Sequence, residues 1–325
     1  EVHLARLAIH RGDFKDAASH LALANEPITR NLHAAQIALQ STFIQGQLYL
    51  AQGDFALAEK YYSDAHNRAN ALQEPLLAAE ALLGMAQAHL AREDLDAAFE
   101  TFLAAGRAFQ EVESTNGDGS AVLGVAQVHM GQQQWDEALE NCEASLTRFS
   151  QANDSLGQAD ALLTRGLAHR SRDENDEALA DFEQALKLYQ QQRRPLGVAD
   201  TRYARAGIFF QQSDLEHARD EQTKAITQVE NVMNSISTPQ QWSLFLRQYA
   251  DLYAQTIVTD IRRNADEQAR TLAQNFARIA GPKELLQNLQ TYERDLPTDG
   301  EDLSPEDARA NQDLLTRIRQ VIKVL

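Results

Sequence analysis

Residues 43–65 read FIQGQLYLAQGDFALAEKYYSDA, and this stretch decides the fold. A small residue, Gly46, stands nine positions before the aromatic Phe55, and Ala58 and Ala65 follow that residue at three and ten positions. A Gly-Asp pair directly precedes the aromatic residue, and a short polar side chain there can cap the helix that follows. Because small side chains let two helices cross closely, the stretch predicts a helix–turn–helix unit.

The same pattern recurs along the chain. An alanine lies three residues after each of six equivalent anchor positions, and the anchors are spaced 41, 40, 40, 40 and 40 residues apart. The anchors are Phe14, Phe55, Leu95, Trp135, Asn175 and Leu215. With alanine at about 16% of the chain, six such matches would arise by chance on the order of 10⁻⁵ of the time, so we treat the repeat as real. One unit cannot bury its apolar face alone, and the sequence therefore predicts six stacked repeats over residues 1–233.

Turn-forming residues separate the expected helices at two places in each repeat. Before most anchors, pairs such as Gly-Asp, Glu-Asp or Ser-Asp can end one helix and cap the next. Proline, glycine and asparagine mark the turns between repeats. These turns are expected at Pro27, Pro75, Gly117-Asp118-Gly119, Asn153-Asp154 and Pro195.

The composition favours an all-α protein. The 325 residues include 51 alanines against 11 valines and 12 isoleucines, with no Val/Ile-rich run of the kind that forms a parallel sheet. A net charge of −17 argues against binding to nucleic acid or to an anionic membrane, because both need a basic surface. No apolar run reaches the roughly 18 residues that span a bilayer. The single cysteine excludes an intrachain disulfide and fits a reducing cytoplasm.

The 40-residue register ends at Met233. Beyond it, the apolar spacing predicts a divergent seventh repeat over residues 234–281. Its first helix is expected to be long and continuous over residues 240–263, and its second helix is expected over residues 265–280.

A helical hairpin is expected over residues 282–325. An acidic loop at residues 296–302 separates its two helices. The last helix is predicted to begin with Ser304 as its N-cap and Pro305 at its first position, because both residue types favour these places.

The repeat pattern resembles the tetratricopeptide repeat (TPR). The best copy runs from Gly46 through Phe55 and Ala58 to Tyr62 and Ala65, and the 40-residue length resembles the longer-helix variety found in signalling scaffolds. The resemblance implies an all-α, right-handed solenoid of six clear repeats and one divergent repeat, followed by the C-terminal hairpin. Since the first repeat starts inside its first helix, we also expect residues upstream of this sequence.

The C-terminal quarter carries a second resemblance. The aromatic-rich residues 242–253 and the alanine-rich helix that ends at Phe276-Ala277 resemble the segment that joins the repeats to the protease domain in TPR–CHAT proteins. In that family the CHAT domain is a caspase-like cysteine peptidase with a His/Cys dyad, and no such pair occurs in this chain. The resemblance implies a sensing and scaffolding region that has no catalysis of its own.

By the same resemblance, the first helix of each repeat forms the inner wall of the solenoid. Three positions on it, at twelve, eight and five residues before the anchor, carry an apolar stripe and the glutamines Gln47, Gln87 and Gln127. Glutamine both donates and accepts hydrogen bonds, which suits the backbone of an extended peptide. Alternatively, the stripe packs between repeats or is covered by the chain's own C-terminal helices. The candidate groove residues are Phe43, Gln47, Leu50, Leu83, Gln87, Leu90, Leu123, Gln127, Met130, Leu163, Arg170, Tyr203 and Phe210.

Arginines concentrate in the fifth and sixth repeats. Arg165 and Arg205 occupy equivalent positions that are apolar in other repeats, and a half-buried arginine needs a partner. The partner is either a carboxylate of this chain or an acidic or phosphorylated ligand. The internal carboxylates would be Asp160, Asp181, Glu183 and Asp200. The candidates for binding an acidic partner are Arg165, Arg170, Arg202 and Arg205.

Three other features suggest chemistry less strongly. His89, His129 and His169 share one position in successive repeats, but such positions lie about 10 Å apart, whereas zinc ligands lie about 2 Å from the ion, so a packing role is favoured. Cys142 holds a position that is aromatic in other repeats, which indicates a buried hydrophobe rather than a nucleophile. The acidic run at residues 173–177 lacks the glycine of a calcium loop and is predicted as a turn and helix start.

These patterns predict a non-catalytic, cytoplasmic scaffold that binds a protein or peptide in its groove. No cofactor, no metal and no contact with nucleic acid or a membrane is expected, and the partner could also be a flanking domain of the same protein. The narrower hypothesis is the regulatory region of a TPR–CHAT-like protease. The alternatives are a ligand- or partner-sensing region of another signalling or transcription regulator, and a standalone adaptor.

Overall fold

The computed structural model describes residues 1–24, 32–236, 238–297 and 304–325. Within these ranges the chain forms seventeen helices and no strand, which confirms the all-α prediction. The expected turn at Pro27 and most of the acidic loop at residues 296–302 lie outside the described residues. The helices of the six repeats are α1 (Val2–His10), α2 (Phe14–Ala24), α3 (Leu32–Ala51), α4 (Phe55–Ala71), α5 (Pro75–Ala91), α6 (Leu95–Glu111), α7 (Thr115–Gly131), α8 (Trp135–Gln151), α9 (Ser155–Ser171), α10 (Asn175–Gln191), α11 (Pro195–Gln211) and α12 (Leu215–Met233). Those that follow are α13 (Pro239–Arg247), α14 (Ala250–Arg262), α15 (Asp266–Ala280), α16 (Lys283–Asp295) and α17 (Pro305–Ile322).

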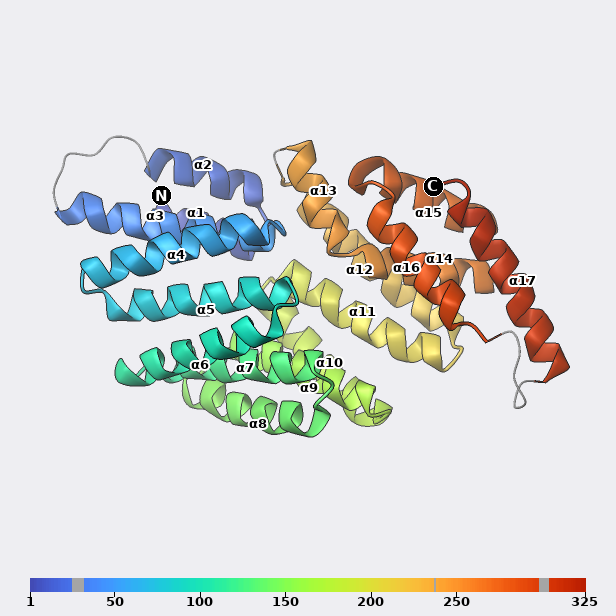
Figure 1. The fold of residues 1–325 in the computed structure, drawn as a ribbon, viewed down its shortest axis with the longest axis horizontal. Coiled ribbons are helices and arrows are strands. Elements are labelled where there is room, and N and C mark those ends of the chain that lie inside the picture. Colours follow the sequence, from blue (N-terminus) through green and yellow to red (C-terminus); the bar gives the residue numbers. More distant parts are fainter. Residues whose placement is uncertain (25–31, 237, 298–303) are drawn as a thin grey trace. The chain divides into compact units, whose positions relative to one another are not determined.

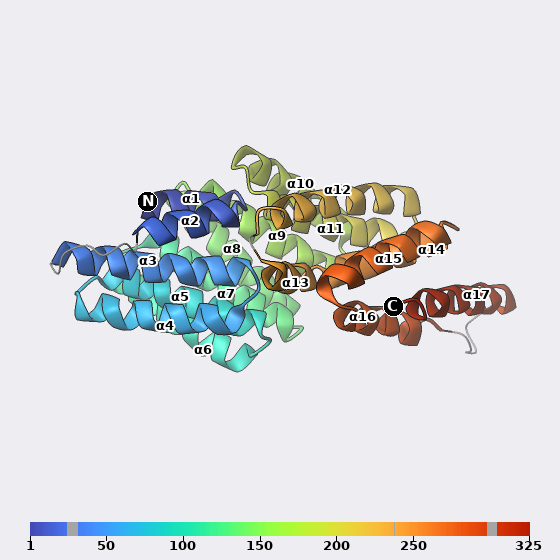
Figure 2. The same cartoon turned by 90° about the horizontal axis from the view of Figure 1, so that it is seen from above.

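The chain divides into two compact units, Glu1–Ala204 and Arg205–Leu325. The division falls within α11, the first helix of the sixth repeat, whereas the sequence places its first domain limit at the end of α12. The predicted limits at residues 233 and 281, and the divergent seventh repeat between them, stay a prediction. In the first unit, each helix from α3 to α10 packs against the next one along the chain (Figure 1). Helices α1, α2 and α3 lie side by side (Figure 2).

The helix boundaries repeat with the sequence. Every anchor residue is the first residue of the second helix of its pair, as Phe55 is for α4 and Leu215 is for α12. The aspartate before the anchor caps that helix in four repeats, through bonds such as Leu57 N–H to the Asp54 carboxylate at 3.2 Å. Each turn also contains one residue in the left-handed conformation, and these residues recur every 20 positions from Gly53 to Ser213. The turns within and between repeats therefore share one geometry.

The small residues of the repeat lie where the helices cross. The alanine three positions after each anchor is fully buried in all six repeats. Glycines allow the closest approaches, because a Cβ atom on Gly157 would lie 2.3 Å from the ring of Phe149. Phe109, Phe149 and Tyr189 recur at 40-residue intervals, each against a glycine of the next helix. The aromatic rings and glycines together fix the spacing between repeats.

One predicted turn is a helix. Gly117-Asp118-Gly119 was expected to link two repeats, but these residues lie in the first turns of α7, and the turn itself is at Glu113 and Ser114. Gly117 is required there because a Cβ atom would lie 2.1 Å from the Phe109 ring. Asp118 accepts hydrogen bonds from Arg148 at 2.5 Å and from Gln110 at 3.0 Å. Glycine marks a packing contact at this point rather than a turn.

The long helix expected over residues 240–263 is two helices, α13 and α14, with a break at Gln248 and Tyr249. The break lets α13 pack at the end of α15, where Ser243 and Arg247 both donate to the carbonyl of Ala280. No glycine or proline stands at the break, so the apolar spacing continues through it and predicts a single helix. The Ser304 cap of α17 is confirmed, since its hydroxyl accepts from the Asp307 N–H at 3.1 Å.

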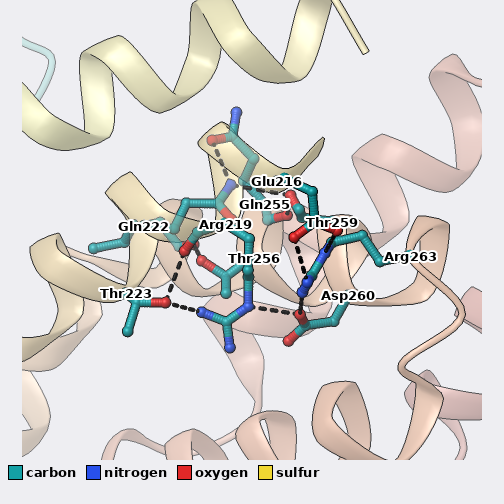
Figure 3. Close-up of polar contacts among 10 residues, drawn as sticks. Glu216, Arg219, Gln222, Thr223, Gln255, Thr256, Thr259, Asp260 and Arg263 are labelled. Atoms are coloured by element: carbon teal, nitrogen blue, oxygen red, sulfur yellow. Dashed lines mark hydrogen bonds and ion pairs between the residues drawn. The ribbon is translucent and has the colours of Figure 1, made fainter. Parts of the chain in front are cut away.

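The second unit contains a buried polar network between α12 and α14 (Figure 3). The carboxylate of Asp260 is fully buried and accepts from the Nε of Arg219 at 2.6 Å, while an Arg263 nitrogen lies 3.5 Å from the same oxygen. The amide of Gln222 donates to Gln255 at 3.2 Å and to Thr259 at 3.0 Å. Removing one partner from such a buried ion pair typically costs about 3–5 kcal/mol. The network thus links α12 to α14, although one oxygen each of Gln222 and Asp260 is buried without a hydrogen bond partner among the described residues.

Among the described helices, none combines the length and the apolar character that crossing a membrane requires.

Candidate functional site

The first unit encloses two adjoining cavities, of about 410 Å³ and 360 Å³. His10, Gln87 and Ser120 line both of them. We call the space formed by the two cavities the inner groove. Its wall consists mainly of the first helices of successive repeats, α3, α5, α7, α9 and the start of α11, together with residues of α1 and large aromatic residues of the second helices. Residues from the first repeat and from the start of the sixth therefore face the same space.

The inner groove brings together about half of the residues that the sequence selects. Those that line it are Phe43, Gln47, Leu83, Gln87, Leu123, Gln127 and Leu163. Those that do not are Leu50, Leu90, Met130, Arg170, Tyr203 and Phe210. The positions five before the anchor lie in the last turn of each first helix, beyond the cavities, and Leu90 packs there against the core around Phe102. Phe210 belongs to the second unit, where its ring contacts Tyr292.

Three glutamines line the groove at intervals of one repeat. Gln47 faces the smaller cavity, Gln127 the larger one, and Gln87 both. Among the described residues, no hydrogen bond partner is found for any of the three side-chain amides, and the Oε1 atom of Gln47 is buried without one. Buried polar groups are normally hydrogen-bonded, so the Gln47 oxygen lacks an expected partner, and the amides of Gln87, which is exposed, and Gln127, which is half-buried, are accessible to a ligand.

A second series of polar residues lies fifteen positions before the anchors, and the sequence analysis does not select it. Gln40, Glu80, Ser120, Asp160 and Asp200 occupy this position in successive repeats, and the last four line the groove. We call these four residues the acidic series. The position lies one helical turn before the apolar stripe and on the same face of the helix. Repeat spacing alone could have revealed this position, since three of the five residues that occupy it are acidic.

The two aspartates of the acidic series differ in their contacts. Asp160 accepts a hydrogen bond from the hydroxyl of Tyr189 at 2.5 Å, and burial raises the pKa of its carboxyl to about 6. Asp200 has neither a hydrogen bond nor an ion pair to any residue that the structure describes, and its side chain is open to the groove. Desolvation by the surrounding helices, helped by the charge of Asp160, raises the pKa of Asp200 to about 7.

Basic groups from α1 and from the turn before α11 face the same cavities. A guanidinium nitrogen of Arg194 contacts Nδ1 of His10, and burial together with the charges of Arg194 and Arg6 lowers the pKa of His10 to about 4. The imidazole is therefore neutral at pH 7. Arg194 forms no ion pair with Asp160 or Asp200 among the described residues, although its charge lowers the pKa of Asp160. The larger cavity thus holds two carboxylates and one guanidinium.

Comparison with known families identifies the repeats. Two sequence models of the tetratricopeptide repeat match residues 43–113, 119–191 and 163–231, which together make up more than half of the chain. The chain is a tetratricopeptide-repeat protein. A search of curated protein sequences found no match to this TPR protein.

Several solved structures share its fold. NprR in complex with its cognate peptide NprX superposes with a TM-score of 0.62 at 16% identity, covering 98% of this chain and 86% of that one. A Rap protein complexed with competence and sporulation factor gives 0.58 at 12% identity, covering 99% and 97%. Aspartyl phosphate phosphatase F from Bacillus subtilis gives 0.56 at 11% identity, covering 98% and 92%. At these identities the similarity concerns the fold alone.

Most arginines of the cluster in this TPR protein have internal partners. Arg165 donates to Asp181 at 2.6 and 2.8 Å and also contacts Glu143. Arg205 lies 3.8 Å from Glu221, which occupies the position of Asp181 one repeat later. The internal ion-pair alternative accounts for these two arginines. A guanidinium nitrogen of Arg170 donates to a backbone carbonyl at 3.1 Å, and Arg202, like Arg170, has a further interaction within the chain. Binding of an acidic partner by the four candidate arginines stays a prediction.

Two of the three aligned histidines have local partners, whereas Nδ1 of His89 is buried without a hydrogen bond partner among the described residues. Nδ1 of His129 lies 2.6 Å from the side-chain oxygen of Gln134, and Nδ1 of His169 lies 2.6 Å from a carboxylate oxygen of Glu174. Cys142 is fully buried, and its desolvation raises the pKa of the thiol to about 12. A thiol with so high a pKa is a poor nucleophile at neutral pH. Within the described ranges, no three side chains of His, Cys, Asp or Glu are placed to share a metal ion.

Proposed function

We propose that this TPR protein is a regulatory scaffold that binds an extended peptide, or an extended segment of a protein, in its inner groove. The observation that carries the proposal is the series of three unpaired glutamine amides on one wall of the groove. Phe43, Leu83 and Leu123 of the apolar stripe lie one turn before these glutamines on the same helices. Amides that hydrogen-bond a peptide backbone, next to apolar side chains that contact its residues, are the two elements of peptide recognition.

The repeat spacing fits an extended ligand. Neighbouring first helices lie about 10 Å apart, and an extended chain advances about 3.3 Å per residue, so one repeat corresponds to three residues. Gln47, Gln87 and Gln127 would therefore bind the peptide backbone at every third residue. Two of the similar structures, NprR and the Rap protein, are described as complexes with a peptide or a signalling factor, which supports the same role here.

A narrower version of the proposal makes the chain the regulatory region of a TPR–CHAT-like protease. It rests on the sequence of α13 to α15 alone. In either version we expect the chain to have no catalysis of its own, and the purified protein should not hydrolyse an aspartyl phosphate, although one similar structure is described as a phosphatase.

Selection from a random heptapeptide display library tests the proposal. We expect the wild-type chain to enrich peptides that lose at least about tenfold in affinity when Gln47, Gln87 and Gln127 are all changed to alanine, because three hydrogen bonds are lost. The matched control changes three exposed glutamines, Gln151, Gln190 and Gln191, to alanine. Equal loss in both variants, or no loss in either, would contradict binding in the inner groove.

A further inference from the structure

We infer that the inner groove selects peptides that carry a positively charged group, and that Asp160 and Asp200 bind that group. The cationic group belongs to the peptide proposed above, so the inference rests on the proposed function. It adds the chemical class of the ligand and the residues that distinguish it.

The first argument is the missing partner. Asp200 lines the larger cavity, and no hydrogen bond or ion pair satisfies its carboxylate among the described residues. The Asp200 side chain is exposed within the groove, so its carboxylate is accessible to a ligand and no group that the structure describes competes for it. Desolvation by the groove walls and the charge of Asp160 raise the pKa of Asp200 to about 7.

The second argument is the balance of charge in the larger cavity. Asp160 and Asp200 contribute two carboxylates, while the guanidinium of Arg194 is held by the neutral His10 rather than by either aspartate. Asp160 and Asp200 occupy the same position in neighbouring repeats, so both face the groove from adjacent first helices. Above pH 7, where both carboxylates are charged, one additional cation between them would complete the balance.

The third argument is the shape of the wall beside the carboxylates. Phe102, Phe149, Leu163 and Leu167 line the same cavity as the two aspartates. A lysine or arginine side chain has an apolar stem and a charged end, so it can contact these apolar side chains while its end reaches the carboxylates. An arginine can also bind two carboxylates at once through its several N–H groups.

Neither aspartate holds the fold together through an ion pair. Ser120 occupies the equivalent position one repeat earlier, so a small neutral side chain is tolerated there. Asp160 can be replaced by asparagine, whose side-chain oxygen can still accept from the hydroxyl of Tyr189. The double variant Asp160→Asn/Asp200→Asn should therefore fold and still bind peptide backbones.

Peptide selection on the wild type and on this double variant tests the inference. Lysine and arginine should be enriched at one position of the wild-type peptides and not in those selected on the variant. The matched control is Asp96→Asn/Asp176→Asn, which changes two exposed aspartates in the first turns of α6 and α10. It should select the same peptides as the wild type.

A selected peptide is then synthesised in three forms, unmodified, with its arginine replaced by neutral citrulline (or its lysine by norleucine), and with its N-terminus acetylated. We expect loss of the side-chain charge to weaken wild-type binding about tenfold or more, and to change binding to the double variant far less. If acetylation alone has this effect, the cation is the terminal ammonium. An equal effect of charge removal on both proteins, or no enrichment of cations, would overturn the inference and leave groove binding intact. Failure to select any peptide that the glutamine variant weakens would overturn both.

Discussion

At the scale of single residues, Asp200 combines a functional role with a cost in stability. Its carboxyl has a pKa of about 7 in the folded chain, against about 3.9 in an unfolded one. Between these pH values the folded state retains a proton that the unfolded chain releases, so this group lowers the free energy of unfolding as the pH rises from about 4 to 7. Because the side chain is exposed within the groove, solvent screens this penalty, which above pH 7 is smaller than the whole shift would give.

Replacing Asp200 by asparagine should therefore stabilise the protein at high pH only. We expect the melting temperature of the Asp200→Asn variant to exceed that of the wild type by about 2–4 °C at pH 8 and to equal it at pH 4, as measured by circular dichroism. Asp96→Asn, at an exposed position, is the control and should show no such pH-dependent difference. A variant less stable than the wild type at pH 8 would mean that the Asp200 carboxylate has a partner in the folded chain.

The acidic series also shows what repeat analysis can miss at this scale. Glu80, Asp160 and Asp200 share a position with Gln40 and Ser120, so the series lacks the uniform residue type that makes the anchor alanines obvious. The pairing of Arg194 with His10 could not be predicted, because 184 residues separate the two in sequence. The sequence does predict the three groove glutamines, because successive repeats carry glutamine at one position. That their amides have no hydrogen bond partner is visible only in the structure.

At the scale of helices, the contacts between aromatic rings and glycines set the packing of neighbouring repeats. Gly157 lies in the first turn of α9, where a Cβ atom would be 2.3 Å from the ring of Phe149. Gly106 lies inside α6, where the nearest atom to a Cβ would be 3.5 Å away, an ordinary contact. The same substitution at these two glycines should thus have opposite effects.

We expect Gly157→Ala to lower the free energy of unfolding by about 1–3 kcal/mol, because the ring and the backbone must move apart. Gly106→Ala should leave it unchanged or raise it by up to about 1 kcal/mol, because alanine favours the helix. Urea unfolding followed by circular dichroism measures both changes. Comparable destabilisation by the two substitutions would show that the close contact of Gly157 with Phe149 is not what requires glycine.

Helix boundaries follow from the sequence wherever the repeat is regular. Each anchor begins a helix, and Pro75 stands at the first position of α5 as its ring geometry favours. The two failures have a common origin. Gly117 suggests a turn but serves a close contact, and the break at Gln248 and Tyr249 has no residue that would signal it. In both places tertiary packing, which a one-dimensional pattern does not contain, decides the local structure.

At the scale of the whole molecule, ion-paired and unpaired charges lie in different places. The net charge is −17, and the basic cluster that interrupts it in the fifth and sixth repeats is largely neutralised by internal pairs such as Arg165 with Asp181. The inner groove keeps carboxylates that are not paired in this way, above all Asp200. Composition predicted an acidic, helical chain. The structure is needed to show which of the carboxylates line the inner groove.

Binding in the inner groove should leave a periodic trace along the chain. The groove is lined mainly by first helices, so a bound peptide should stabilise α3, α5, α7 and α9, with α1 and the start of α11. The second helices of the repeats contribute a few aromatic residues, and the larger part of each faces away from the cavities. Ligand binding slows amide exchange where local opening would break its contacts.

We therefore expect hydrogen–deuterium exchange, measured by mass spectrometry with and without a selected peptide, to show slowed exchange in segments about 40 residues apart. Slowing should be strongest in the peptides that span residues 75–91, 115–131 and 155–171, and weak in those from α13 to α17. The variant with Gln47, Gln87 and Gln127 changed to alanine serves as the control and should show little slowing at the same peptide concentration. Slowed exchange concentrated in the second unit would place the ligand outside the inner groove, and would contradict the proposed function even if the affinity is high.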